Sequence, residues 1–270
     1  MIYPEHINVP TEKIKELAST NDYLAELCRQ GKAEEFYTII AEKQTAGKGQ
    51  RGNFWESESG KNLTFSTVLY PTAIKANKQF YFSMLAAIAI IDALTDYTDG
   101  FSIKWPNDIY WHDKKICGIL IENELEGKYL SQTIIGIGLN INQETFLSSA
   151  PNPVSLYQII GKEIDREEVF SKVIHAILGG YKSLESDFHE ASAAILLLYK
   201  KFLYRRKGFH SFQDNNGIFT ALLPVFQLAS KGIERKNITL SKKLELNFER
   251  DISDSISTLV ALSRAQIEMS

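Results

Sequence analysis

Apolar residues recur at helical spacing near the start of the chain. Four of them fall between residues 11 and 30, which predicts helical structure there. The polar run Ser19-Thr20-Asn21 interrupts this pattern, and it indicates a short loop or a helix start because such side chains cap helices. The four apolar residues are Ile14, Leu17, Leu24 and Leu27.

Short runs of β-branched and aromatic residues dominate the middle of the chain. Strands are predicted at residues 36–41 and 63–70, and an apolar helix is predicted from about residue 78 to 97. A dense β region follows, in which only short turns separate the predicted strands. Such connections join antiparallel hairpins, whereas parallel strands need long crossovers. The strands of this region are predicted at residues 103–105, 108–111, 115–122 and 129–142.

The last third of the chain predicts two helices and then a different kind of structure. Residues 165–190 form an amphipathic pattern, and a further helix is predicted at 192–204. Beyond Arg205, strand-like pieces and an Asn215-Asn216-Gly217 turn predict a small β-rich domain. Because 270 residues exceed the usual size of one domain, we expect one domain at residues 1–205 and another at 206–270.

Composition and charge argue against several classes of function. Hydrophobic residues make up 44% of the chain and charged residues 23%, as in globular proteins. A net charge of −3 argues against nucleic acid as the partner. Cys28 and Cys117 form no Cys-x-x-Cys pair. Residues 1–10 lack the pattern of a secretory signal. The apolar stretch 80–94 is too short to span a bilayer. We therefore expect a folded cytoplasmic protein that does not contact a membrane.

Residues 47–52, with the sequence Gly-Lys-Gly-Gln-Arg-Gly, fit the spacing of the dinucleotide fingerprint. That fingerprint needs a helix opening at the third glycine and an acidic residue about 20 positions later, and neither is present. A Walker-type phosphate loop is also absent. Two readings remain open: a simple flexible hairpin, or a loop in which Lys48, Arg51 and backbone amides surround an anion.

Two further clusters are unusual. One of them places charged and polar groups beside apolar strands: Lys104-Trp105-Pro106-Asn107-Asp108, followed by Lys114-Lys115. It is either a hairpin that carries polar side chains on its surface or a functional site. In residues 135–142, glycines at positions 136 and 138 remove side chains from one face of a strand. The usual reasons for such glycines are close packing of another backbone or room for a flat ligand.

Together these motifs resemble the biotin protein ligase family over about residues 17–190. The family's Ser-Thr-Asn, glycine loop with a later tryptophan, Lys-Trp-Pro-Asn-Asp, Lys-[apolar]-x-Gly-Ile-Leu and Gly-x-Gly-x-Asn occur here in order. The resemblance implies an α/β (α+β) fold: a mixed, largely antiparallel sheet flanked by helices, similar to class II aminoacyl-tRNA synthetases, and a small SH3-like C-terminal domain. The chain departs from the family at Gln50, where many members have arginine, and beyond Thr220. The early position of Ser19 argues against an N-terminal DNA-binding domain with repressor activity.

The resemblance also implies an activity and its residues. The family uses ATP and Mg²⁺ to convert biotin into biotinyl-5'-AMP, and then transfers biotin to a lysine of a biotin carboxyl carrier protein, the acceptor domain of a carboxylase. A homodimer is possible. The implied catalytic residues are Lys115, Arg51 and Lys48. The implied biotin-binding residues are Ser19, Thr20, Asn21, Gln44, Lys48, Gly49, Gln50, Lys115, Gly118 and Gly136. The implied ATP-binding residues are Arg51, Trp55, Asn107, Lys115 and Asn140, and Asp108 is the candidate for the metal.

Three other functions compete with this one. A lipoate or octanoate ligase shares the fold and the activation chemistry but lacks the glycine loop. A biotin-responsive binding protein without catalysis is suggested by Gln50, although Lys115, Arg51 and Asn140 argue against it. A nucleotide-binding scaffold would bind ATP regardless of biotin.

Overall fold

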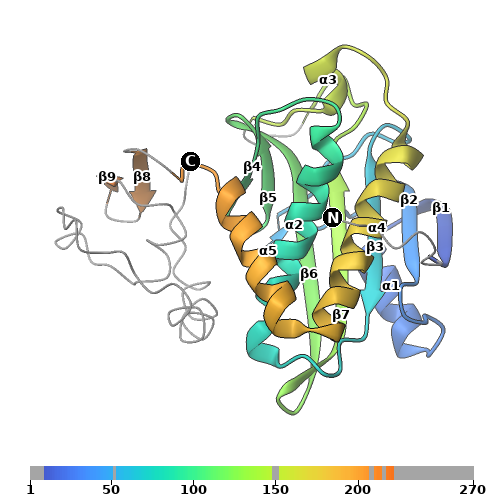
Figure 1. The fold of residues 1–270 in the computed structure, drawn as a ribbon. Helices are drawn as coiled ribbons and strands as arrows, with labels where there is room; N and C mark the ends of the chain where they lie inside the picture. The colour runs from blue at the N-terminus through green and yellow to red at the C-terminus, as the bar shows by residue number, and fades with distance from the viewer. Residues whose placement is uncertain (1–8, 51–52, 148–151, 207–209, 215–216, 222–270) are drawn as a thin grey trace. The chain divides into compact units, whose positions relative to one another are not determined.

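The computed structural model describes residues 9–50, 53–147, 152–206, 210–214 and 217–221 (Figure 1). The chain divides into two compact units, Met1–Phe202 and Leu203–Ser270, and each is described by itself. The predicted assignment of residues 1–205 to a catalytic domain and 206–270 to an SH3-like domain stays a prediction.

The first unit is built on one seven-stranded sheet of strand order β1-β2-β3-β7-β6-β5-β4. β1 and β2 are parallel, and every other neighbouring pair in this sheet is antiparallel. The predicted mixed, largely antiparallel sheet is therefore confirmed. The strands are β1 (Thr11–Leu17), β2 (Thr38–Gln44), β3 (Leu63–Leu69), β4 (Phe101–Lys104), β5 (Asp108–Trp111), β6 (Lys114–Glu126) and β7 (Tyr129–Leu139).

The helical prediction for residues 11–17 is wrong, because this segment is strand β1. Its spacing of Ile14 and Leu17 fits one helical turn, but pairing with β2 from Thr11↔Thr38 to Leu17↔Gln44 overrides that local signal. Helix α1 (Thr20–Arg29) begins only afterwards. The Ser19 side chain caps it by accepting a hydrogen bond from the backbone N–H of Asp22, so the predicted helix start at this polar run is confirmed.

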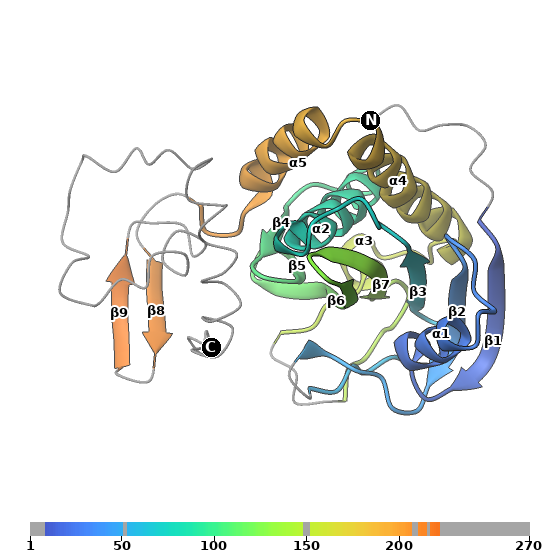
Figure 2. The same cartoon turned by 90° about the horizontal axis from the view of Figure 1, so that it is seen from below.

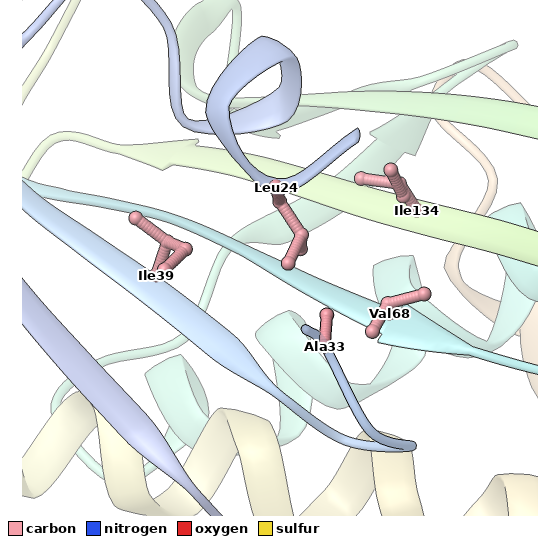
Figure 3. Close-up of a cluster of buried hydrophobic side chains, with 5 residues drawn as sticks. All are labelled: Leu24, Ala33, Ile39, Val68 and Ile134. Carbon is pink, nitrogen blue, oxygen red and sulfur yellow. The ribbon is translucent and has the colours of Figure 1, made fainter. Parts of the chain in front are cut away.

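Helices cover both faces of the sheet (Figure 2). On one face, α1 lies over β2, β3 and β7, and its Leu24 packs in a buried cluster with Ala33, Ile39, Val68 and Ile134 (Figure 3). On the other face, α2 (Phe80–Thr95), α4 (Arg166–Ser186) and α5 (Phe188–Phe202) pack together. A short 3₁₀ helix (Ala76–Lys78) precedes α2, and α3 (Leu156–Ile160) lies in the connection to α4.

Side chains of β3 point alternately to the two faces of the sheet and therefore contact both layers of helices. Phe65 faces α4, where its ring lies 5.2 Å from that of Phe170. Ser66 and Val68 point to the opposite face, toward α1. Ser66 therefore lies on the same face of the sheet as the polar residues at the start of α1.

The segment Ala76–Thr95 is long and apolar enough to span a membrane by length and composition alone. However, 67% of its most apolar window is buried in the protein. Core helices pass the same test, and α2 buries residues on all sides, among them Phe82, Leu85 and Ile90. The predicted apolar helix at about residues 78–97 is therefore confirmed as a core helix, whereas the prediction that the apolar stretch is too short to span a bilayer is wrong for the longer segment Ala76–Thr95.

Replacing Gly180 of α4 by alanine should destabilise the first unit by about 1–3 kcal/mol, the usual cost of overpacking a core. A Cβ atom at this position would lie 2.3 Å from Leu85 Cδ1, so the buried Leu85 side chain would have to repack or α2 and α4 would have to move apart. Chemical denaturation measures the loss. Gly179→Ala, at a less buried position of the same helix, is the matched control, and equal losses in both variants would contradict the packing argument.

In the second unit, β8 (His210–Asp214) and β9 (Gly217–Ala221) form an antiparallel hairpin. Asn215 and Asn216 of the predicted turn, and the sequence after residue 221, lie outside the described residues. The SH3-like character of this unit stays a prediction.

Candidate functional site

The start of α1 and the end of β2 form a buried polar cluster. Gln44 Oε1 accepts hydrogen bonds from the Thr20 backbone N–H at 2.8 Å and from the Thr20 hydroxyl at 3.1 Å. Ser19, Thr20 and Asn21 are each at most 5% exposed although all three are polar. Helix capping and strand pairing thus bring together four residues that the resemblance assigns to biotin.

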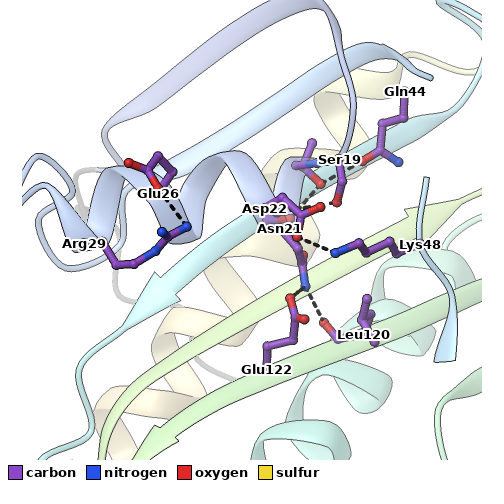
Figure 4. Close-up of polar contacts among 11 residues, drawn as sticks. Ser19, Asn21, Asp22, Glu26, Arg29, Gln44, Lys48, Leu120 and Glu122 are labelled. Carbon is purple, nitrogen blue, oxygen red and sulfur yellow. Dashed lines mark hydrogen bonds and ion pairs between the residues drawn. The ribbon is translucent and has the colours of Figure 1, made fainter. Parts of the chain in front are cut away.

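Asn21 is held from two directions. Its Nδ2 donates to Glu122 Oε2 at 2.7 Å and to the Leu120 carbonyl at 3.4 Å (Figure 4). Its Oδ1 lies 2.6 Å from the Ser66 hydroxyl, which also lies 2.7 Å from the Thr20 hydroxyl. A Cβ atom at position 136 would lie 2.1 Å from Asn21 Oδ1. Glycine at position 136 is therefore what allows Asn21 to lie directly on β7.

The described residues on either side of positions 51 and 52 of the glycine loop are paired, with an antiparallel bridge between Lys48 and Phe54. The Gly49 N–H donates to the Asn53 carbonyl at 2.7 Å, and the Lys48 ammonium forms an ion pair with Asp22 of α1 at 2.5 Å (Figure 4). This contact raises the pKa of Lys48, first through its hydrogen bond to Asp22. The loop is thus tied to the same helix start as the polar cluster. Gln50 is partly buried in the loop, and Arg51 lies outside the described residues.

The Trp55 indole lies on a floor made by two glycines. Gly118 of β6 and Gly138 of β7 are paired across the sheet. Cβ atoms at these positions would lie 3.1 Å and 2.4 Å from the indole ring. The expected reasons for the glycines on β7 were another backbone or a flat ligand, whereas the structure places the side chains of Trp55 and Asn21 there.

Lys115 and Asp108 form the charged part of the site. Their side chains make an ion pair, with Lys115 Nζ 2.8 Å from Asp108 Oδ1, at side-chain exposures of 28% and 19%. Lys115 Nζ also lies 5.6 Å from the centre of the Trp55 ring, within the range of a cation–π contact. The antiparallel β5–β6 hairpin creates this pair, and it brings Lys115 to the edge of the glycine floor.

Two predicted asparagines are anchored to neighbouring backbone. Asn107 exchanges hydrogen bonds with Ile119, in one direction through its side-chain amide. Asn140 is 2% exposed, and its Nδ2 donates to the Val154 carbonyl at 3.1 Å. Its Oδ1 and the Trp55 Nε1 are buried without a hydrogen-bond partner among the described residues. Buried polar atoms of this kind indicate that a ligand or water completes the site.

The site contains three residues that the sequence reasoning missed: Ser66, Glu122 and Asp22. Ser66 had at most a weak signal, since it is one of three hydroxyl residues, with Thr64 and Thr67, in a strand whose other four residues are apolar. Glu122 and Asp22 had none, because acidic residues at the end of a strand or in the first turn of a helix are common. Only the fold places them against Asn21 and Lys48.

A preformed metal cluster is absent from the described residues, because no group of three or more His, Cys, Asp or Glu side chains comes together there. Asp108 is the acidic residue beside Lys115, but its contact in the structure is the ion pair. Cys117 follows Lys115 closely in the sequence, and burial raises its pKa well above the ordinary thiol value. Its thiol is therefore an unreactive core group.

Comparisons with known proteins show what this region of the chain is similar to. Residues 14–140 match the model described as Biotin/lipoate A/B protein ligase family. The chain is 33% identical over 181 residues to the bifunctional ligase/repressor BirA of Bacillus spizizenii, covering 64% of this chain and 51% of that protein. It is 33% identical over 137 residues to the biotin--[acetyl-CoA-carboxylase] ligase of Paracoccus denitrificans, covering 48% and 56%.

A solved structure extends this likeness to the fold. The biotin protein ligase from Aquifex aeolicus in complex with biotin and ATP superposes with a TM-score of 0.62 at 27% identity, covering 78% of this chain and 85% of that one. Over this region the chain is similar to biotin protein ligases in sequence and in fold, as its motifs led us to expect. It spans about half the length of the curated relatives that it matches.

Proposed function

We propose that this protein activates biotin with ATP and transfers it to a lysine of a carrier protein. The observation that carries the proposal is the arrangement on one face of β7. Asn21 lies over Gly136, and Trp55, with Lys115 beside it, lies over Gly138. Residues two apart on a strand are about 7 Å apart, so a polar subsite adjoins a cationic and aromatic one.

The polar subsite suits the ring system of biotin. A ureido ring is neutral and offers one carbonyl acceptor and two N–H donors, so it needs directional hydrogen bonds instead of charge. The half-buried Gln44 and the buried Asn21 and Ser19 carry such groups. The loop backbone at residues 48–50 and Gly118 would complete the subsite.

The cationic subsite suits the reaction itself. A carboxylate oxygen of biotin attacks the α-phosphorus of ATP, the bond to the β-phosphate oxygen breaks, and pyrophosphate leaves. Two anions meet in this step, so a cation at the meeting point stabilises the transition state. Lys115 occupies that place, and Lys48 and Arg51 would approach when the glycine loop closes. Trp55 and Asn140 would hold the adenine, and Asn107 would shape the strand beside it.

Magnesium fits this site together with the nucleotide. Mg²⁺ is usually held by one or two carboxylates, substrate phosphates and water, so a preformed protein cluster is not required. Asp108 is the residue that would hold it, which requires that its ion pair with Lys115 loosens when ATP binds. The ion would neutralise charge on the departing pyrophosphate.

The second step transfers the biotinyl group. The carrier lysine attacks the acyl carbon of the adenylate with its neutral amine, the bond to the phosphate oxygen breaks, and AMP leaves as the amine loses a proton. The acceptor is the biotin-accepting domain of a carboxylase, as the names of the relatives suggest. We place this reaction in the cytoplasm, and pairing of a sheet edge would allow a homodimer.

The decisive test is exchange of labelled pyrophosphate into ATP. With magnesium present, we expect exchange that depends on biotin, because only adenylate formation is reversible in this way. Lipoate is the essential control, since the matched family model covers both kinds of ligase. Exchange with lipoate alone would contradict the proposal and favour a lipoate ligase. A folded protein that binds biotin without exchange would favour a binding protein.

A further inference from the structure

We propose that Glu56 is a positioning residue that holds Trp55 over Gly138 by anchoring the chain segment that follows the indole. This inference rests on the proposed function, because it concerns the nucleotide side of that site. Residues 55–58 belong to no helix or strand, so a ladder of backbone hydrogen bonds does not fix them. The indole Nε1 has no hydrogen-bond partner among the described residues. The position of Trp55 therefore depends on what holds its neighbours in the chain.

The Glu56 carboxylate is bound to the segment that follows β7. Its Oε1 accepts a hydrogen bond from the Leu147 backbone N–H at 2.8 Å and another from Gln143 Nε2 at 3.3 Å. On the N-terminal side of the indole, the backbone N–H of Trp55 donates to the Gly47 carbonyl at 2.9 Å. The indole thus lies between two anchors, and Glu56 supplies the one that a side chain makes.

Gln143 gives this anchor a fixed point in the core. Asn62 directly precedes β3, and the pairing of the start of β3 with the end of β7 places it beside the residues that follow β7. Asn62 Oδ1 accepts from the Ile141 N–H, so its NH₂ group faces Gln143 Oε1. The NH₂ end of Gln143 is then left to donate to Glu56. Gln143 and Asn62 are 1% and 2% exposed, so water does not compete for these bonds.

The chemistry of the two donors separates a positioning role from a charge role. A backbone N–H and an NH₂ group can only donate, and both meet the same oxygen of Glu56. Glutamine at position 56 keeps an acceptor oxygen of the same reach and loses the charge, and its own NH₂ group would turn away from the two donors. Alanine loses both the acceptor and the charge.

Glu58 provides a matched control for the loss of one negative charge. It is exposed and lies two residues beyond Glu56 in the same segment. It contributes its backbone N–H to Gln143 Oε1 at 3.1 Å, which a substitution of its side chain retains. Glu58→Ala therefore removes a carboxylate from this segment without removing a side-chain anchor to Gln143 or Leu147.

Glu56→Ala should raise the KM for ATP in biotin-dependent pyrophosphate exchange by about 10-fold, the scale of one hydrogen bond to a charged group. The affinity for biotin alone, measured by titration calorimetry, should stay at the wild-type value because Glu56 anchors the other subsite. Glu56→Gln should restore most of the KM for ATP, and Glu58→Ala should match the wild type.

Amide hydrogen exchange, followed by NMR on the full chain without ligands, tests the anchor independently of activity. The Leu147 N–H should exchange faster in Glu56→Ala and keep its protection in Glu56→Gln. The proposal is overturned if Glu56→Ala leaves either the KM for ATP or the Leu147 exchange rate unchanged. It is also overturned if Glu56→Gln or Glu58→Ala loses as much as Glu56→Ala, because charge would then be the cause. A wild-type chain without biotin-dependent pyrophosphate exchange would overturn the proposed function, whereas the hydrogen-exchange result would still report on the anchor.

Discussion

Replacing Lys115 by alanine should lower the rate of biotin-dependent pyrophosphate exchange by about 100- to 1000-fold, the effect of removing one group that stabilises transition-state charge. Lys115 carries the cation at the edge of the glycine floor, 2.8 Å from Asp108 and beside Trp55. Biotin binding should change much less, because the polar subsite around Asn21 does not depend on this side chain. Exchange kinetics and calorimetric titration with biotin measure the two effects.

The adjacent Lys114 provides the control. It is also on β6 but exposed, so Lys114→Ala removes the same charge without touching the site and should keep the exchange rate. Lys115→Ala also leaves the largely buried Asp108 without its cation, so its thermal unfolding must be compared with the wild type. A folded Lys115→Ala variant with full exchange would refute the assignment of this lysine.

Much of this site could be predicted because its motifs are contiguous. Ser19-Thr20-Asn21, the glycine loop and the hairpin that carries Lys115 are each local in sequence, and short hairpins can be recognised from turn residues. Their assembly is not local. Asn21 meets Glu122 through helix α1 packing on a sheet whose strand order follows from long-range pairing. No periodic pattern in the sequence predicts that contact.

Strand β1 shows the same limit in the fold. Its seven residues carry too few apolar positions to distinguish a helical turn from an edge strand, and pairing with β2 decides. The glycines of β7 show a second limit. The sequence indicated that something must occupy the face of β7 that its glycines leave without side chains. The structure shows that Asn21 and Trp55, which are distant in sequence, lie there.

These glycines allow the two subsites to be separated experimentally. Gly136→Ala would place a Cβ atom 2.1 Å from Asn21 Oδ1, and Gly138→Ala would place one 2.4 Å from the Trp55 ring. Both distances are far below van der Waals contact, so the side chain on the floor must move. We expect Gly136→Ala to weaken biotin binding and Gly138→Ala to weaken ATP binding, each by about 10- to 100-fold, as overpacking costs of 1–3 kcal/mol imply.

The two variants control for each other, because they add the same methyl group to the same face of the same strand. Calorimetric titration of each variant with biotin alone, and with a non-hydrolysable ATP analogue in the presence of biotin, gives four affinities. If biotin binds before ATP, Gly136→Ala would also lower the affinity for the nucleotide. Gly138→Ala should leave the affinity for biotin alone unchanged. If Gly138→Ala weakened biotin as much as Gly136→Ala, the floor of β7 would be a single subsite, and the separation of ureido recognition from adenylate chemistry would be wrong.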